Sequence, residues 1–242
     1  MIVGEEGILI KKLYLVMMKN HCGNRKQCLT LLKHHAVIVN GQLITDCNYI
    51  VKTDDIIEVN GKRIDSQPFV YYMMNKPAGY ICANYDEKYP CVVDLIDRED
   101  CYCLGRLDRD TTGLLLLTND ASLSKQLLLP QHHVTKTYFV ECMKPLDQSF
   151  VEIFKDGILI DKDIKCLPAQ LEIIDHYHCY VTISEGKYHQ IKKMFLSCHN
   201  QVVSLKRIEF ANILLDSKLS LGDYRPLTKD EFQKLKEFMF YR

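Results

Sequence analysis

Several features are scarce or missing in this sequence of 242 residues, and each absence excludes a class of protein. Neither charge sign is in excess, because Lys and Arg together number 31 and Asp and Glu together also number 31. This balance excludes a polycation that would bind nucleic acid over its whole surface. Internal repeats and low-complexity tracts are absent, and hydrophobic residues make up 47% of the chain, enough for a sizeable core. The sequence therefore predicts a folded globular protein of one or two domains.

The 11 cysteines show none of the spacings that are typical of a metal site or a disulfide framework. No two of them are separated by two residues, and the nearest pair, Cys101 and Cys103, alternates as strand residues do. His132, His133 and His189 also form no convincing set of metal ligands. We therefore expect reduced, packed cysteines in a cytoplasmic protein with no bound metal.

Long apolar runs are also missing. The longest apolar stretch near the N-terminus, residues 8–18, is interrupted by Lys11 and Lys12. It is too short and too charged to span a bilayer, and it has no signal-peptide cleavage pattern. We expect a soluble protein with no membrane partner. Nothing in the sequence marks an oligomer interface, so we also expect a monomer.

Charge is balanced in total but is unevenly distributed along the chain. Residues 11–35 contain six Lys or Arg, three His and no acidic residue, and residues 187–207 contain five Lys or Arg and again no acidic residue. Residues 86–100, by contrast, hold six acidic and two basic residues. Separated charge of this kind suits a partner with localised negative charge, such as an RNA backbone. Ordinary solvated faces would give the same counts, so charge alone leaves both interpretations open.

The first 64 residues read as a small α/β module. Residues 13–18 and 25–35 are predicted helices, with Asn24 as the N-cap of the second. Strands at 37–39 and 42–44 flank an Asn-Gly hairpin turn, and a further strand is expected at 56–59. We interpret residues 1–10 as an extension before this module and residues 65–69 as a linker after it.

Residues 70–242 read as a second domain with many strands and few helices. Strands are expected at 70–74, 101–104, 114–118, 137–142 and 181–184. Apolar residues at helical spacing predict a helix over 191–198, and Thr228 with Glu231 forms a capping box before a C-terminal helix at 229–240. The predicted fold class is α+β, in which the small α/β module precedes a mixed, mainly antiparallel β-sheet domain.

The loop at residues 105–113 reads Gly-Arg-Leu-Asp-Arg-Asp-Thr-Thr-Gly and carries two candidate acids between two strands. Asp108 and Asp110 could be the paired acids of a hydrolase, or partners in a salt-bridged loop with a structural role only. Arg106 and Arg109 lie in the same loop, and nearby cations favour the ionised form of a carboxylate. An ionised carboxylate suits a nucleophile better than a general acid.

This segment resembles the central motif of the RNA pseudouridine synthases. Asn-Lys-Pro-Ala-Gly at 75–79, the strand at 132–140, Glu-Gly-Lys-Tyr-His-Gln-Ile-Lys-Lys-Met-Phe at 185–195, the strand at 205–208 and the closing segment 221–227 resemble other motifs of that family, in the expected order. Tyr-His-Gln at 188–190 is similar to the small-subunit ribosomal (RsuA-like) branch. The N-terminal module resembles the RNA-binding domain named after ribosomal protein S-four. It departs from that pattern at Tyr14, where relatives have Asp, and near His35, where the second helix usually ends in Gly.

The resemblance implies an enzyme that isomerises uridine to pseudouridine in ribosomal RNA. The C1′–N1 bond breaks, the uracil turns, and the base is rejoined to C1′ through C5, which requires no cofactor. Asp108 is the implied nucleophile; attack on C1′ and removal of the C2′ proton both remain open at this point. Tyr138 is implied to stack on the uracil, although without the resemblance it would read as a core strand residue. Lys192 is implied to pair with Asp108, at a position where relatives often carry Arg.

The target uridine must leave its base stack, at a cost of roughly a few kcal/mol. Arg106 is implied to fill the vacated space, and a salt bridge to a neighbouring acid is a compatible second role. The predicted contacts with RNA phosphates are Lys12, Arg25, Lys26 and Lys33 in the N-terminal module, and Lys76, Lys187, Lys206 and Arg207 in the catalytic domain.

Two other functions compete with this one. A non-catalytic RNA-binding assembly factor would need none of Asp108, Tyr138 and Lys192. A carboxylate-pair glycosidase acting on free nucleosides would leave the basic N-terminal module unexplained. The predicted partner is therefore ribosomal RNA or an assembly intermediate of the small ribosomal subunit.

Overall fold

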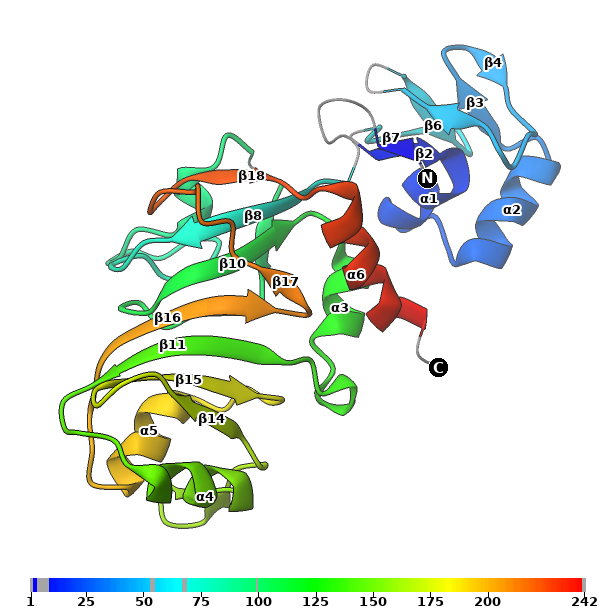
Figure 1. The fold of residues 1–242 in the computed structure, drawn as a ribbon. Helices are drawn as coiled ribbons and strands as arrows, with labels where there is room; N and C mark the ends of the chain where they lie inside the picture. Colours follow the sequence, from blue (N-terminus) through cyan, green and yellow to red (C-terminus); the bar gives the residue numbers. More distant parts are fainter. Residues whose placement is uncertain (1, 4–8, 53–54, 67–68, 99, 241–242) are drawn as a thin grey trace. The chain divides into compact units, whose positions relative to one another are not determined.

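The computed structural model describes residues 2–3, 9–52, 55–66, 69–98 and 100–240 (Figure 1). The chain divides into two compact units, Met1–Val70 with Asn119–Ala121, and Tyr71–Thr118 with Ser122–Arg242. The segment Asn119–Ala121 is joined to the rest of the first unit through Asn119. The side-chain oxygen of Asn119 accepts a 2.9 Å hydrogen bond from the Val70 N–H. Parts of the predicted extension (1 and 4–8) and of the predicted linker (67–68) lie outside the described residues.

In its described residues, the first unit contains two helices and two small antiparallel sheets, in agreement with the expected α/β composition. One sheet has the order β1-β2-β5 and the other β4-β3-β6-β7. The elements are β1 (Ile2–Val3), β2 (Leu9–Lys12), α1 (Leu13–Lys19), α2 (Arg25–Lys33), β3 (Val37–Val39), β4 (Gln42–Leu43), β5 (Ile50–Val51), β6 (Ile57–Val59) and β7 (Lys62–Ile64). Both predicted helices and the Asn-Gly hairpin are confirmed, and the second helix ends before its predicted last residue.

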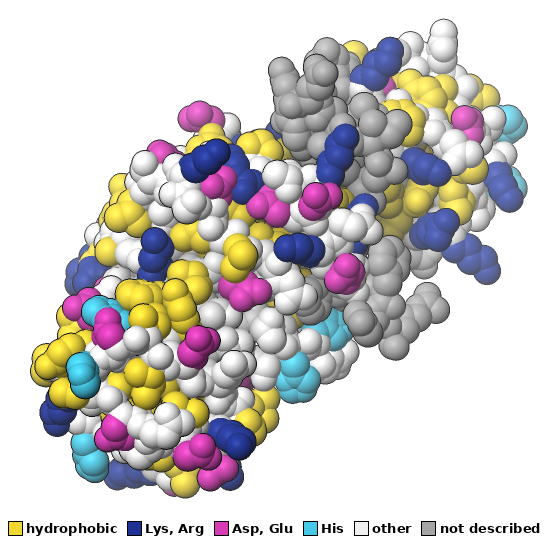
Figure 2. Space-filling view, in the orientation of Figure 1, with side chains coloured by type: hydrophobic (Ala, Val, Ile, Leu, Met, Phe, Trp, Pro, Cys, Tyr) yellow, Lys and Arg dark blue, Asp and Glu magenta, His cyan; other side chains and the backbone are white. Residues whose placement is uncertain are grey.

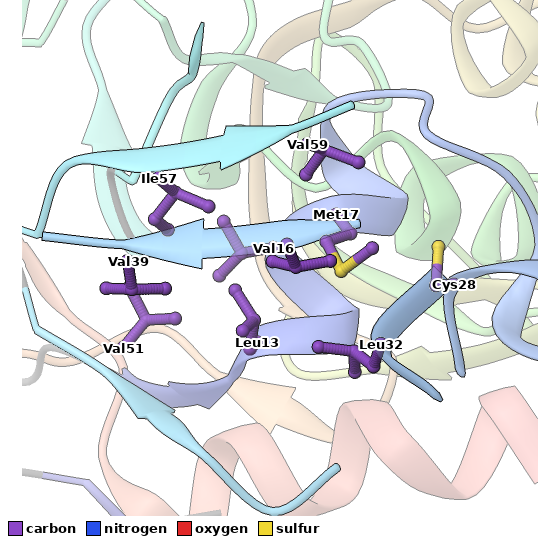
Figure 3. Packing of buried hydrophobic residues seen from close by; sticks show 10 residues of the cluster. Leu13, Val16, Met17, Cys28, Leu32, Val39, Val51, Ile57 and Val59 are labelled. Carbon is purple, nitrogen blue, oxygen red and sulfur yellow. The ribbon is translucent and has the colours of Figure 1, made fainter. Parts of the chain in front are cut away.

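The core of this unit lies between the two helices and the strands (Figure 3). Leu13, Val16 and Met17 are spaced so that they share one face of α1, and all three are fully or almost fully buried. They pack with Cys28 and Leu32 of α2 and with apolar residues of β3, β5 and β6. Side chains of a strand point alternately to its two faces, so one face of each short strand is buried, as the alternating burial of β3 and β6 shows.

Both ends of α2 follow from local sequence. The Asn24 side chain accepts a hydrogen bond from the Gln27 N–H, and the Gln27 side chain accepts one from the Asn24 N–H, so the predicted N-cap is a full capping box. At the other end His35 adopts a left-handed backbone with φ 59°. Gly would adopt this conformation without steric cost, so His35 keeps the usual helix-ending geometry with a less favourable residue.

The second unit is built on a nine-stranded sheet with the order β14-β15-β11-β16-β10-β8-β18, to which β17 and β9 add at β16 and β10 (Figure 1). Every pairing is antiparallel except β10 with β16, which confirms the mixed, mainly antiparallel prediction. The strands are β8 (Tyr71–Lys76), β9 (Tyr102–Leu104), β10 (Thr112–Thr118), β11 (Lys136–Cys142), β14 (Gln170–Ile173), β15 (His178–Ile183), β16 (Val202–Phe210), β17 (Ile213–Leu214) and β18 (Tyr224–Pro226).

The remaining elements flank this sheet. The Phe195 ring of α5 contacts the Phe150 and Phe154 rings of α4, so these two helices pack together beside the β14 end of the sheet (Figure 1). The predicted C-terminal helix and its capping box are confirmed. These elements are η1 (Val92–Leu95), α3 (Ala121–Leu127), η2 (Pro130–His132), α4 (Gln148–Asp156), β12 (Leu159–Ile160), β13 (Ile164–Lys165), α5 (Gln190–Ser197) and α6 (Lys229–Phe240).

Strand β10 determines where the 105–113 loop lies. One edge of β10 pairs with β8. The other edge pairs with two strands, with β16 at Thr112 and Gly113 and with β9 at Leu116 to Thr118. The loop follows β9 and leads into the start of β10, where β10 pairs with β16 and not with β9. Six of the seven β10 residues are buried, so the loop is mounted on the rigid centre of the sheet.

Gly113 permits this switch of partners, and its replacement tests the arrangement. It has φ +100°, and a Cβ added there would lie 2.2 Å from the Arg207 carbonyl oxygen. We expect Gly113→Ala to lower the free energy of unfolding by more than about 3 kcal/mol in urea denaturation. Gly79→Ala is the matched control, because Gly79 has φ +94° but open space around its Cβ position. Strain alone should cost that variant about 1 kcal/mol, and equal losses in the two variants would refute the steric argument.

Candidate active site

The loop at residues 105–113 is held in place by hydrogen bonds to its backbone. Gly105 begins it with φ +79°, and the Thr111 N–H donates to the Asp108 carbonyl at 3.1 Å to close a turn. The Arg109 carbonyl accepts a 2.7 Å bond from the Gly79 N–H, and the Leu107 N–H donates to the Cys82 sulfur at 3.3 Å. The backbone that carries Asp108 is therefore fixed from both sides.

Lys76 holds the same loop from within. Its side chain is fully buried, and its ammonium donates to four backbone carbonyls at 3.0 to 3.3 Å. These carbonyls belong to Pro77, Asp108, Arg109 and Thr111. Burial lowers the pKa of Lys76 from its ordinary value. The prediction that Lys76 lines a phosphate path is wrong for this structure, because a fully buried ammonium bound to four carbonyls is inaccessible to RNA.

Arg207 is buried as well. Its side chain is only 1% exposed, its Nε donates to the Leu114 carbonyl at 2.7 Å, and its guanidinium lies over the Phe210 ring. The predicted phosphate contact by Arg207 is therefore wrong for the same reason. The motif Leu-Lys-Arg-Ile reads as a basic strand, but its register directs this residue inward while the neighbouring Lys206 is only half-buried.

Asp108 and Lys192 form the predicted ion pair. The Lys192 Nζ lies 3.0 Å from Asp108 Oδ2 and 2.6 Å from Asp110 Oδ1, so one ammonium joins both acids of the loop. Burial lowers the pKa of Lys192, but its hydrogen bonds to Asp110 and Asp108 outweigh that effect and raise it. Burial likewise raises the pKa of Asp110, and the Lys192 ammonium reverses the shift. Asp108 is one-quarter exposed and Asp110 almost three-quarters, so Asp108 is the more enclosed carboxylate.

The turn before α5 delivers Lys192 to this place. The Glu185 side chain forms an ion pair with Lys187 and accepts hydrogen bonds from the Leu167 N–H and the Gln190 side chain. Gln190 also accepts a 2.9 Å bond from the Lys187 N–H, which closes the turn at the helix start. Lys187 therefore contributes to the structure of this turn. Whether it also meets RNA stays a prediction.

His189 lies near the second carboxylate oxygen of Asp108. Its Nε2 is 3.6 Å from Asp108 Oδ1, and its ring stacks on that of Tyr188 at 3.8 Å between centroids. His189 is the N-cap of α5, with φ 53°, and it stands three residues before Lys192, on the same helix face. Both carboxylate oxygens of Asp108 thus face a basic side chain.

Tyr138 belongs to a row of paired residues that crosses the sheet next to the loop. In order, the row is Lys76, Gly113, Arg207 and Tyr138, on β8, β10, β16 and β11. Directly paired residues place their side chains on one face, so Tyr138 and Lys76 share a face of the sheet. Tyr138 is 8% exposed. This row brings a mostly buried tyrosine to the face from which Lys76 reaches the Asp108 carbonyl.

The other predicted site residues lie at the surface. The Arg106 and Arg109 side chains are exposed, and the Arg109 guanidinium stacks on the Tyr89 ring at 4.4 Å. In the N-terminal unit Arg25, Lys26 and Lys33 are exposed on α2, whereas Lys12 is partly buried and donates to the Asn48 side chain. Figure 2 shows Lys and Arg side chains with few acidic ones on the visible face of this unit.

Three participants in the site go beyond what the sequence predicted. Asp110, which the sequence left as a paired acid or a salt-bridge partner, shares Lys192 with Asp108. His189 was considered only as a metal ligand, and its helical spacing to Lys192 was the available signal for its place in the site. The Cys82 contact with Leu107 joins segments 25 positions apart, and no local pattern predicts it. Across the part of the chain that the structure describes, no cluster of three or more potential metal ligands occurs, and no helix has the length and apolarity to cross a membrane.

Removal of the buried ammonium tests the construction of the loop. Lys76→Met would leave four backbone carbonyls without their charged donor. We expect the free energy of unfolding to fall by roughly 2–4 kcal/mol in urea denaturation. Lys218→Met, at an exposed lysine of the same unit, should change it by less than about 0.5 kcal/mol. Similar losses in both variants would show that the buried contacts contribute nothing.

Comparison with known proteins agrees with the motifs of the loop. A family model described as RNA pseudouridylate synthase matches residues 70–197. The chain is 37% identical over 216 residues to ribosomal small subunit pseudouridine synthase A of Haemophilus influenzae, which covers 87% of this chain and 93% of that protein. It is 38% identical over 224 residues to an uncharacterised RNA pseudouridine synthase of Bacillus subtilis, covering 89% and 94%. A crystal structure of a pseudouridylate synthase superimposes with a TM-score of 0.68 at 35% identity, over 93% of this chain and 99% of that one. The chain belongs to the RNA pseudouridylate synthase family.

Proposed function

We propose that this enzyme converts uridine to pseudouridine in the RNA of the small ribosomal subunit, with Asp108 as its catalytic carboxylate. The observation that carries the proposal is the ion pair between Asp108 and Lys192, on a loop that is fixed to the centre of the sheet. The loop sequence alone was equally compatible with a structural salt bridge. The additional contact of His189 with the second carboxylate oxygen supports a chemical role for Asp108.

In this proposal Asp108 acts on the ribose of the target uridine. The C1′–N1 bond breaks while the carboxylate stabilises or traps C1′, and the uracil then turns to present C5. A bond forms between C1′ and C5, the C5 hydrogen leaves to solvent, and N1 gains a proton. Lys192 holds one carboxylate oxygen in place through its 3.0 Å contact. Since one proton is lost from C5 and one is gained at N1, the product is an isomer of the substrate and the reaction consumes no cofactor.

Tyr138 and Arg106 have roles on either side of the displaced base. Tyr138 is mostly buried and lies in the row of Gly113 and Arg207, which suits a ring that stacks on the uracil. Arg106 is exposed two residues before Asp108, so its planar guanidinium can occupy the space that the uridine leaves. Within the described ranges Arg106 forms no ion pair, which leaves its charge available for RNA.

The substrate class rests on two supports. The relative from Haemophilus influenzae is named as an enzyme of the small ribosomal subunit, and it is covered over 93% of its length. The N-terminal unit adds an α2 surface on which Lys26 and Lys33, seven residues apart, share one helix face. This surface, together with Arg25 and Lys12, is proposed to bind the RNA backbone near the target. We propose a monomer that acts on the rRNA or on an assembly intermediate. We also propose a cytoplasmic location, because such RNA occurs in the cytoplasm.

Loss of the catalytic carboxylate gives the direct test. Release of tritium from 5-tritiated uridine in a small-subunit rRNA fragment measures the exchange at C5. We expect Asp108→Asn to reduce the rate by more than about 10⁴-fold while RNA binding, measured by filter retention, is retained. Asp110→Asn is the matched control, because it removes the neighbouring acid that shares Lys192, and it should keep activity within about tenfold.

Three outcomes would contradict the proposal in different ways. Equal activity of Asp108→Asn and the parent enzyme would refute the catalytic role of Asp108. Tight binding without tritium release from any rRNA would favour a non-catalytic assembly factor. Release from large-subunit RNA alone would refute the proposed substrate and leave the chemistry intact.

The RNA-binding surface has a separate test. Lys26→Gln with Lys33→Gln removes two exposed charges from α2, and Lys62→Gln with Arg63→Gln removes two exposed charges from β7 of the same unit. We expect the α2 variant to reduce the slope of log affinity against log salt concentration by roughly 1.5, and to raise KM without changing kcat. The β7 variant should keep the parent slope, and equal effects would mean that α2 has no special role.

A further inference from the structure

Arg109 follows Asp108 directly, and its side chain has a partner that the proposed chemistry does not use. The Arg109 guanidinium lies over the Tyr89 ring, 4.4 Å from the ring centroid. Arg109 is exposed, and within the described part of the chain its guanidinium forms no ion pair and no hydrogen bond. A guanidinium is planar and has two faces, so a tyrosine ring on one face leaves the other available. The Arg109–Tyr89 stack therefore presents a flat cationic surface beside the proposed catalytic carboxylate.

Backbone hydrogen bonds hold both members of this stack in place. The Ile81 N–H donates to the Pro90 carbonyl at 3.0 Å, so the segment that carries Tyr89 is closed at its base. The start of the same segment is joined to the loop of Asp108, because the Gly79 N–H donates to the Arg109 carbonyl at 2.7 Å. The stack is thus organised before any ligand binds. A ligand that uses its open face would lose little affinity to the ordering of these side chains.

The charges around the stack favour a nucleobase over a phosphate as its ligand. Two exposed acids, Asp86 and Glu87, lie in the segment that carries Tyr89, and the exposed Asp110 follows Arg109. A phosphate brought to Arg109 would be repelled by these carboxylates, whereas the face of a base carries no net charge. Unpaired RNA bases commonly stack on aromatic rings and on the planes of arginine side chains. The open face of the guanidinium therefore suits an unpaired base.

We propose that the Arg109–Tyr89 stack binds the unpaired base of a nucleotide next to the target uridine, and so helps to select which uridine is modified. The inference rests on the proposed function, because the neighbour is defined by the uridine that reaches Asp108. Arg109 adjoins Asp108 in a loop with a fixed backbone, so an RNA strand that delivers a uridine there passes within reach of the stack. Arg106 keeps its separate role in the space that the uridine leaves. The stack contributes to substrate binding and takes no part in the chemical step.

A substitution that keeps the charge and removes the plane tests the protein side of this contact. In the tritium-release assay with a small-subunit rRNA fragment, we expect Arg109→Lys to raise KM about tenfold and to keep kcat within about twofold. Tyr89→Leu, which removes the aromatic face that holds the guanidinium, should raise KM about threefold. Lys88→Gln is the matched control, because the exposed Lys88 Nζ also lies over the Tyr89 ring, 5.2 Å from its centroid. It should keep the parent KM.

A matching change in the RNA tests the other side of the contact. The modified uridine is first located by chemical mapping of pseudouridine, and RNAs are then synthesised with an abasic nucleotide directly before or directly after it. We expect one of the two abasic RNAs to raise the KM of the parent enzyme about tenfold. The same RNA should raise the KM of Arg109→Lys by less than about twofold, because both changes remove one interaction. Lys88→Gln should respond to the abasic RNA as the parent does.

The outcomes separate this inference from the proposed function. A parent-like KM for Arg109→Lys would overturn the stacking role. Equal penalties from the abasic RNA in the parent and in Arg109→Lys would also overturn it, because the base would then bind elsewhere. A fall in kcat with unchanged KM would place Arg109 in the chemical step instead. If the parent enzyme forms no pseudouridine in any rRNA, the proposed function fails and the stacking role falls with it.

Discussion

The site depends on one buried charge. The Lys76 ammonium is surrounded by four backbone carbonyls, three of which belong to the loop that carries Asp108. A buried cation without such partners would be strongly unfavourable, so the loop must adopt the conformation that supplies them. The requirement works in both directions, because the loop carbonyls point inward and the ammonium supplies their charged donor. The position of the Asp108 carboxylate is therefore set by its backbone before any side-chain ion pair forms.

The ion pairs of Asp108 then act on a carboxylate that is already in place. Lys192 and His189 come from a helix start that is organised by its own turn around Glu185. Asp108 and Lys192 are each about one-quarter exposed, so their attraction alone is too weak to position the loop. The geometry is best explained by two rigid elements, the 105–113 loop and the start of α5, that lie next to each other. The ion pair with Lys192 then orients the Asp108 carboxylate between them. Asp110 competes for the same ammonium, and an RNA phosphate near the loop would alter that competition.

Sequence patterns predicted the local elements well and the long-range contacts poorly. Helix α2 has a local N-cap signal at Asn24, and the C-terminal helix has one at Thr228, so both starts were predicted correctly. Helix α4 was missed, although Asp147 caps it. The motifs identified the acids of the loop, and the ion pair with Lys192 was expected. Burial of basic residues could not be predicted, because it depends on the register of strands far apart in sequence.

The burial of Lys76 and Arg207 has a physical cause in the register of the sheet. Lys76 and Arg207 stand in family motifs, and in an enzyme that acts on RNA their charges suggest contacts with phosphates. Sheet register instead places both in the row that crosses Gly113, where the missing side chain lets β16 approach β10 closely. Two cations thus lie beneath the loop and favour the negative forms of nearby groups. The charges of Lys76 and Arg207, which the sequence assigns to RNA binding, here organise the interior of the candidate active site.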